Sequence, residues 1–263
     1  MKNESVKKYI VIYLSFAFGL PFICVLLVKS FNIFQSGVLG FTLYGIEAMT
    51  PAIAALLTTA ILGDSKMIRL FLKKCYFDNI KIWYIILAVI IPFSVFTLAK
   101  ITSLVFVQVT PFITSINGKK LLIIMWALIT EELGWRGFLQ ERLDMYFGHL
   151  GTPIIIGIIW ALWHYHFFWL GTMSAPFILF VLGCITDSIG YYWITKKSKG
   201  NVIPASVWHC VENLCFSLFL INPEYNQGRI EPYLLYTIFS IVMAVIISIL
   251  GSFSIRKDNA ISY

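Results

Sequence analysis

Charged residues are scarce in this chain. Only 13% of its 263 residues are Asp, Glu, Lys or Arg, whereas 59% are hydrophobic and the mean hydropathy is +0.83. Soluble domains carry roughly 25% charged residues, so the composition excludes an ordinary water-soluble globular protein. The sequence predicts an integral membrane protein.

Linkers and long polar segments are also missing. No stretch rich in Pro, Gly or Ser divides the chain, no internal repeat is evident, and the longest polar stretch is a basic loop at about 63–81. A single integral membrane domain over residues 1–263 is the simplest organisation. The apolar residues of the loop follow helical spacing and its basic residues fall on another face, which is typical of an amphipathic helix on the inner leaflet.

Disulfide and metal signatures are absent as well. The five cysteines are odd in number and form neither a CxxC pair nor a zinc-ribbon spacing, and no HExxH motif occurs. We expect all five to be buried as small hydrophobic side chains: Cys24, Cys75, Cys184, Cys210 and Cys215. The basic and then apolar N-terminus lacks a small-residue cleavage site, so we expect an uncleaved first span and not a signal peptide.

The sequence instead contains apolar stretches of about 20 residues, the length that crosses a bilayer as a helix. They lie near 9–28, 37–62, 82–107, 121–143, 152–171, 176–195, 201–221 and 230–253. We therefore expect an all-α, polytopic transmembrane bundle of about eight helices. Hydropathy alone also fits seven spans, because the fourth stretch carries charges in its second half.

The net charge of +7 invites a nucleic-acid function, but the positions of the basic residues explain it better. Lys and Arg mark the cytoplasmic side of membrane proteins. With the N-terminus inside, the inner segments hold most of the basic residues, and the outer loops hold Lys29, Lys119, Lys120 and Arg229. The sequence thus predicts a multi-pass protein of a cell membrane, best suited to a bacterial plasma membrane, with both termini cytoplasmic and no nucleic-acid partner. It leaves the oligomeric state open.

A charged run, EELGWR at 131–136, interrupts the fourth apolar stretch. A charge near the bilayer centre costs about 2.5–3.5 kcal/mol even on the most favourable scale, so such groups pair or face a cavity. Glu132 and Arg136 are four residues apart, so they share a helix face and can form an ion pair. Glu131 is left for other partners, which suits a general base or acid. The alternative is a purely structural ion network.

Two histidines lie in the fifth stretch. His164 and His166 differ by about 200° around a helix, so only one of them can face a site. Trp160 lies one turn before His164 and could pack against its imidazole, which favours His164 as the functional residue. We expect His166 to be a hydrogen-bonding core residue.

The seventh stretch carries His209 and Asn213 at i, i+4, where they could point two donors at one place, as in an oxyanion hole. Glu212 lies close to the same face, and either tunes His209 or pairs with a polar group across the bundle. Asp187 and Glu47 have no obvious local partners, and each contacts either the site or a neighbouring helix.

These polar groups lie at similar depths in the membrane. At 1.5 Å per residue, Glu131, His164 and Asn213 lie about 18 Å from the cytoplasmic ends of their spans, and His209 lies about 12 Å from its end. Groups from three helices thus share one layer of the membrane. Sequence spacing leaves open that Glu131, His164 and His209 meet as ligands of a divalent metal such as zinc.

Three motifs occur in order: EExxxR from residue 131, an aromatic-xxx-His from residue 160, and HxxxN from residue 209. Together they resemble the motifs of the CAAX protease and bacteriocin-processing (CPBP) family of intramembrane proteases, which includes the type II CAAX prenyl proteases. The resemblance covers about 131–213, with a family-like core at about 121–221. It implies a helical bundle with a membrane-embedded polar cavity open to the cytosol.

The resemblance also implies residue roles. Glu131 and His164 would activate the attacking water, and His209 and Asn213 would stabilise the oxyanion. The supporting residues would be Glu132, Arg136 and Trp160. The family usually has Phe where this chain has Trp160, and we expect this difference to change the bulk near His164 but not its chemistry.

The family has been described both as metalloproteases and as metal-independent glutamate proteases. We favour the glutamate type, with no cofactor, because the cluster lacks a third separately oriented His or Cys ligand. The expected substrate is a membrane-associated or lipidated protein or peptide, in contact with membrane lipids.

Two other functions stay open. The first is a non-catalytic membrane protein of the same family, such as a bacteriocin immunity (Abi) or interaction protein, which keeps the polar cluster as a folding core. The second is a proton-coupled transporter with buried Glu and His as its relay. A transporter predicts inverted repeats and broken helices at mid-membrane, and the sequence shows no such symmetry.

Overall fold

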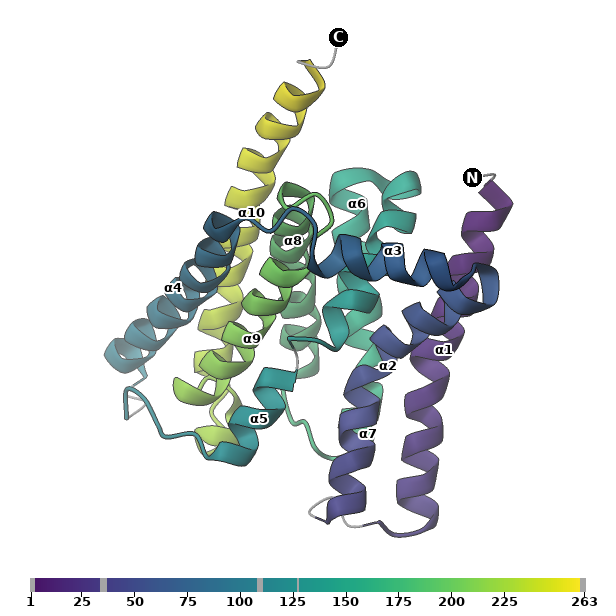
Figure 1. The fold of residues 1–263 in the computed structure, drawn as a ribbon. Helices are drawn as coiled ribbons and strands as arrows, with labels where there is room; N and C mark the ends of the chain where they lie inside the picture. The colour runs from purple at the N-terminus through teal and green to yellow at the C-terminus, as the bar shows by residue number, and fades with distance from the viewer. Residues whose placement is uncertain (1–2, 34–36, 108–110, 127, 261–263) are drawn as a thin grey trace.

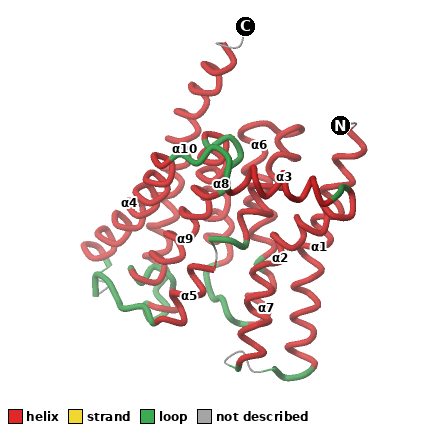
Figure 2. The backbone as a smooth tube through the Cα atoms, in the orientation of Figure 1, coloured by secondary structure: helices red, strands yellow, loops and turns green. Residues whose placement is uncertain are grey.

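The structure of the protein is a computed structural model that describes residues 3–33, 37–107, 111–126 and 128–260 (Figure 1). Within these ranges every regular element is a helix (Figure 2), as the composition predicts. Both ends of the chain lie at the same end of the bundle, which we call the termini end. The opposite end, which we call the loop end, contains the connecting residues 111–117, 171–176 and 219–230.

The helices follow one another in a simple order. The N-terminal part contains α1 (Asn3–Ser30), α2 (Val38–Leu62), α3 (Ser65–Tyr76) and α4 (Ile82–Phe106). The remainder contains α5 (Gly118–Trp126), the π-helix η1 (Leu133–Leu139), α6 (Gln140–Trp163), α7 (Tyr165–Leu170), α8 (Phe177–Lys197), α9 (Ile203–Leu218), the 3₁₀ turn η2 (Pro223–Tyr225) and α10 (Glu231–Ala260). Helices α1 and α2 pack side by side, and α8 lies against α6, α9 and α10.

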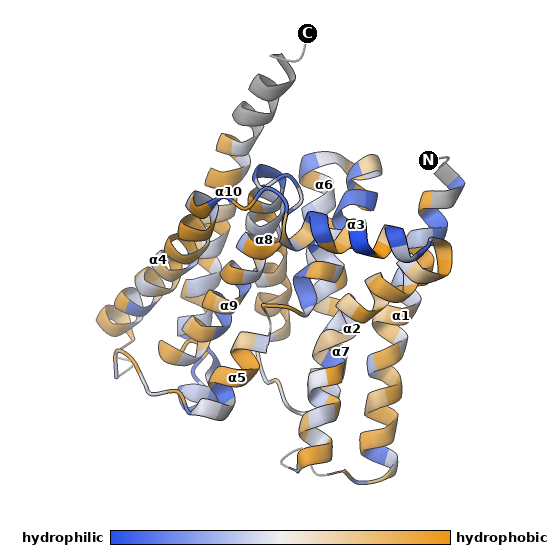
Figure 3. Ribbon diagram, viewed as in Figure 1, coloured by the Kyte–Doolittle hydropathy of each residue, from blue (hydrophilic) through white to orange (hydrophobic). Residues whose placement is uncertain are grey.

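Seven helical segments of the described chain are long and apolar enough to cross a membrane, and Figure 3 shows apolar residues along most of their length. The segment Leu133–Leu170 is 38 residues long and has a kink at Gly148, where φ is 63° and ψ is −166°. The chain reverses direction near this kink, at the termini end (Figure 1). The protein is therefore a polytopic helical membrane protein, and α5 with η1 provides the additional pass that hydropathy placed near 121–143.

That additional pass is not the single regular helix that the sequence predicts over 121–143. Helix α5 ends at Trp126, a turn follows at 128–130, and η1 has the wider π-helical winding. A Cβ added at Gly134 would lie 2.4 Å from the backbone oxygen of Pro51, so only glycine allows α2 to approach this closely. The π-helix lies within residues 130–140, all of which are buried between helices.

The basic loop at 63–81 contains the predicted amphipathic helix. Helix α3 lies across the termini end, with polar residues on one side and apolar residues on the other (Figure 3). Its buried Cys75 packs with Ala52, Leu133 and Val202, and burial raises the pKa of this thiol to about 12. All five cysteines are free and buried, which confirms their expected role as hydrophobic side chains.

Candidate active site

Two cavities adjoin one another inside the helical bundle. The first, of about 440 Å³, lies among α5, α8, α9 and α10, and the second, of about 380 Å³, lies between α2 and α5. The residues that line both cavities are Tyr44, Ile123, His164, Met173, His209 and Asn213. The predicted histidines and asparagine therefore share one hollow, although they come from separate segments of the chain.

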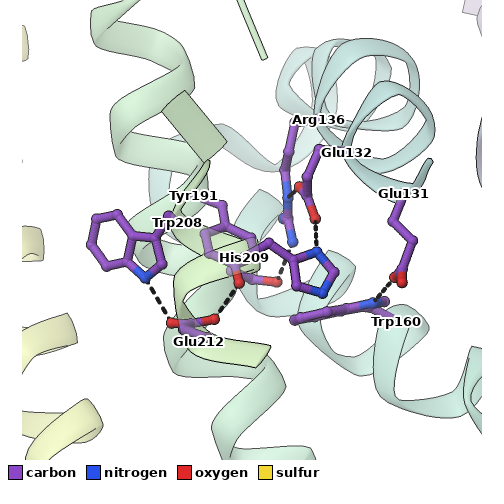
Figure 4. A network of polar contacts seen from close by, with 9 residues as sticks. Glu131, Glu132, Arg136, Trp160, Tyr191, Trp208, His209 and Glu212 are labelled. Atoms are coloured by element: carbon purple, nitrogen blue, oxygen red, sulfur yellow. Dashed lines mark hydrogen bonds and ion pairs between the residues drawn. The ribbon is translucent and has the colours of Figure 1, made fainter. Parts of the chain in front are cut away.

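Glu131 lines the second cavity, directly after the turn that ends α5. Its Oε2 accepts a hydrogen bond from the indole Nε1 of Trp160 at 2.8 Å (Figure 4). Glu131 is 7% exposed. Because Glu131 also lines the second cavity, its carboxyl group can interact with a molecule there.

Glu132 has other partners than Glu131 and belongs to a packed region. Its Oε2 accepts a hydrogen bond from Arg136 Nε at 2.8 Å, and both side chains are fully buried, so the predicted ion pair is confirmed. Arg136 Nη2 also donates to Ser188 Oγ at 3.0 Å, and the guanidinium lies 4.9 Å from the centre of the Tyr191 ring. These partners reduce the cost of burying both charges in the membrane.

His209 connects the packed region to the cavity. Its Nδ1 lies 3.0 Å from Glu132 Oε1. Because an ionised carboxylate only accepts hydrogen bonds, Nδ1 carries the proton in this pair, and Nε2 is left for the cavity. The ring stacks on Tyr191 at an interplanar angle of 27° and meets the Trp160 ring edge-on, which fixes its orientation.

His164 lies at the junction of α6 and α7, where the predicted continuous helix over 152–171 is interrupted. Its Nδ1 lies 2.8 Å from the backbone oxygen of Trp160. A carbonyl only accepts, so Nδ1 carries the proton and Nε2 of the neutral ring is an acceptor. The ring is held between Trp163 and Phe180, at centroid distances of 5.0 and 4.9 Å.

His166 lies outside this site. It is fully buried, its Nδ1 bonds to the backbone oxygen of Trp163 at 2.7 Å, and it lines neither cavity. The prediction that only His164 of this pair faces a site is confirmed.

Trp160 contacts three of the candidate catalytic residues. Its side chain donates to Glu131, its backbone oxygen accepts from His164, and its ring centre lies 5.3 Å from that of His209. The tryptophan in place of phenylalanine therefore has an effect beyond the bulk near His164 that the sequence predicts, because it also contacts Glu131. Phenylalanine has no N–H group, so the hydrogen bond to Glu131 depends on the indole.

Asn213 is half-buried and lines both cavities, one helical turn beyond His209. Glu212 also lines the first cavity, but both of its carboxylate oxygens have partners: Tyr191 Oη donates to one, and Trp208 Nε1 donates to the other at 2.6 Å (Figure 4). Of the two alternatives for Glu212, pairing across the bundle is the one that these contacts support.

The remaining buried acids differ from each other. Asp187 lines the first cavity and accepts a hydrogen bond from Tyr236 Oη at 2.8 Å, so it lies at the site as well as against a neighbouring helix. Glu47 is buried but lines neither cavity. Sequence reasoning missed Ser188, Tyr191 and Tyr236, because neutral hydroxyl groups give no signal in an apolar span.

The candidate metal ligands do not fit a metal site in their present arrangement. Within the described ranges, no three His, Cys, Asp or Glu side chains form a group that could hold a metal ion. Glu131, His164 and His209 line one cavity, and the contacts above leave one nitrogen or oxygen of each side chain unengaged, but the three side chains do not form such a group. We therefore derive no reaction step through a metal, and the expectation that no cofactor is needed stays a prediction.

These features define a polytopic membrane protein with a Glu/His-lined cavity, and comparisons with known proteins agree. Residues 118–215 match the family described as Type II CAAX prenyl endopeptidase Rce1-like. CAAX prenyl protease 2 of Methanococcus maripaludis is 26% identical over 113 residues, which are 40% of this chain and 42% of that relative. Over this region the chain is similar to CAAX prenyl proteases, and it spans less than half the length of the relative that it matches.

The matched region contains every candidate catalytic residue. Glu131, His164, His209 and Asn213 all lie within residues 118–215, together with the supporting Arg136. Residues 1–117, which contain α1 to α4, lie outside the matched region.

Proposed function

We propose that this protein is an intramembrane endopeptidase, which hydrolyses a peptide bond of a membrane-associated or lipidated protein or peptide. One observation carries the proposal: Glu131, His164, His209 and Asn213 all line one cavity within the bundle. The relation to CAAX proteases supports protease activity in general. The substrate and the residue roles below are our own inference.

Water activation is the role that suits Glu131 and His164. Glu131 has one oxygen held by Trp160, and His164 presents its acceptor Nε2. In the proposed reaction a water oxygen bonds to the carbonyl carbon of the peptide, and its proton passes to Glu131 or His164. The same proton then moves to the leaving nitrogen as the C–N bond breaks. A positioned general base typically contributes about 10²–10⁴-fold in rate.

His209 and Asn213 suit oxyanion stabilisation. The Glu132 carboxylate at His209 Nδ1 stabilises a doubly protonated ring, which would present Nε2–H to the cavity. Asn213 can offer its amide N–H₂ one turn further along α9. Preorganised donors of this kind are worth about 10²–10³ in rate each.

Glu132, Arg136 and Trp160 are proposed as positioning residues. Arg136 holds Glu132, Glu132 holds His209, and Trp160 holds Glu131. None of these contacts needs a metal ion, and for this reason we favour the glutamate type of protease. The alternative is a metalloprotease that uses a divalent metal such as zinc, and the experiment must distinguish the two types.

The test is a cleavage assay in membranes that contain the protein and a peptide substrate. We expect cleavage to persist when a chelator removes divalent metals and to be lost in Glu131→Ala, with unchanged accumulation of the protein. Loss of cleavage with the chelator, restored by zinc, would favour a metalloprotease. Full activity of Glu131→Ala would overturn the catalytic assignment.

The cellular setting is also proposed. The positions of Lys and Arg favour a plasma membrane, with both termini in the cytoplasm. A bacterial cell suits this compact chain.

A further inference from the structure

The catalytic cavity extends to the loop end of the bundle. Its first compartment is lined by Asn117, Asn222, Glu224 and Tyr225, which belong to connections at that end, and Asn117, Glu224 and Tyr225 are exposed. A substrate can therefore approach the cavity from the loop end.

The termini end of the cavity is closed by packed side chains. Residues 130–140 are all buried, and the fully buried Trp135, Arg136 and Phe138 fill the space beyond Glu132. Trp208 is also fully buried next to Glu212. The termini end therefore offers no route to Glu131 and His209.

Basic residues concentrate at the opposite end of the bundle. Those described near the termini end are Lys7, Lys8, Lys66, Arg69, Lys73, Lys74, Lys81, Arg142, Lys196, Lys197 and Lys199. The loop end has Lys29, Lys119, Lys120 and Arg229. Figure 3 shows the hydrophilic residues of α3 and its neighbours gathered at the termini end. This asymmetry favours a cytoplasmic termini end, because basic residues near the ends of spans are retained on that side.

We propose that the catalytic cavity opens on the extracytoplasmic side of the membrane. Its substrate is then a polypeptide segment presented at the outer surface, such as an exported or outer-leaflet-anchored peptide, and not a cytosolic protein. The sequence-based expectations of cytoplasmic termini and of a cavity open to the cytosol cannot both hold, since the termini and the cavity mouth lie at opposite ends. The charge distribution decides between them.

The groups at the mouth suit a peptide. Glu224 Oε1 accepts a hydrogen bond from the Ser174 backbone N–H at 2.5 Å, and Lys120 Nζ lies 3.4 Å from the centre of the Tyr225 ring. Both charge signs and the Asn117 amide therefore surround the entrance. Such a rim can bind the polar backbone of a peptide. A hydrocarbon chain has no polar groups that would use these contacts.

Cysteine labelling tests the orientation directly, and the buried native cysteines keep the background low. Glu224→Cys places a thiol at the mouth, and Lys199→Cys places a matched thiol at an exposed position between α8 and α9. A membrane-impermeant maleimide is applied to intact spheroplasts and to permeabilised ones. We expect Glu224→Cys to be labelled in intact spheroplasts and Lys199→Cys only after permeabilisation. The reverse pattern, labelling of both thiols in intact spheroplasts, or failure of Glu224→Cys to label under either condition would overturn the proposal.

A cleavage readout then separates this inference from the proposed function on which its substrate rests. A bulky impermeant maleimide on Glu224→Cys, added from outside, should lower cleavage at least about tenfold by blocking the entrance. The same reagent on Lys199→Cys after permeabilisation should leave cleavage unchanged. If the labelling pattern is as expected but the unmodified protein cleaves no peptide, the orientation stands and the proteolytic function fails. If cleavage occurs but labelling is reversed, the function stands and the orientation fails.

Discussion

Glu131 and Glu132 are adjacent in sequence but belong to two different regions of the molecule. Glu131 lies in the cavity region, with His164, His209 and Asn213. Glu132 lies in the packed region, where Arg136 and His209 occupy both of its oxygens. The difference teaches that a carboxyl group is available for chemistry only where its surroundings leave an oxygen free, whatever its neighbours in the chain.

The two regions should therefore respond differently to substitution. Changes in the cavity region should lower the rate of cleavage and leave the fold intact. Changes in the packed region should lower the free energy of unfolding first, because a buried charge loses its partner there.

Of the two neighbouring histidines, His164 and His166, we expect the larger loss of cleavage rate for His164→Ala. Loss of its acceptor Nε2 should lower cleavage by about 10²–10⁴-fold, as for removal of a general base. His166→Ala is the matched control, because His166 is also buried but lines neither cavity. Cleavage per folded molecule, measured for both variants, checks the comparison. Equal losses of cleavage rate in the two variants would show that lining the cavity gives His164 no special role.

In the packed region, Arg136→Met should destabilise the protein by about 3–5 kcal/mol, because Glu132 would be left as an unpaired buried charge. Lys196→Met removes an ion pair with Asp144 that is partly exposed, and it should cost only about 0–1 kcal/mol. Unfolding of the two variants in detergent or bilayers measures the difference. A change of less than 1 kcal/mol in Arg136→Met would contradict the structural role of the pair.

Asn213→Ala tests the oxyanion site. Removal of one preorganised donor should lower the maximal rate about 10²–10³-fold, with little effect on substrate affinity or on stability. Ser217→Ala is a suitable control, since Ser217 also lines the first cavity one turn further along α9. Steady-state kinetics that separate kcat from KM check this prediction, which fails if the loss lies in KM alone.

The smallest expected effect is that of Trp160→Phe, which keeps an aromatic ring but removes the donor to Glu131. A hydrogen bond to a charged group is worth about 1.5–3 kcal/mol, so kcat should fall by about ten- to a hundredfold, with a shifted pH profile. Trp163→Phe also removes an indole donor, but its partners are the Ala17 backbone and Thr50. A pH profile that is unchanged in Trp160→Phe would show that the indole does not position Glu131.

Local spacing made part of this site predictable. The Glu132–Arg136 pair and the separation of His164 from His166 follow from helical geometry over a few residues, and both are confirmed. Apart from the stretches near 121–143 and 152–171, the apolar stretches also predicted the membrane helices to within a few residues. These features depend on neighbours in sequence, which a single sequence displays.

Contacts between distant segments were not predictable. The break after Trp126 and the π-helix depend on the approach of Pro51 to Gly134. The indole bond of Trp160 to Glu131 spans 29 positions in the sequence. Both features depend on tertiary packing, which cannot be predicted from the periodicity of the sequence.

The central claim is that Glu131 is the working carboxylate, and Glu131→Gln tests it most directly. Glutamine has nearly the same shape and can still accept the Trp160 hydrogen bond, but it cannot take a proton from water. The measurement is the rate of peptide cleavage per folded molecule in membranes. We predict a fall of about 10²–10⁴-fold with unchanged stability; a rate equal to that of the native protein would contradict the account.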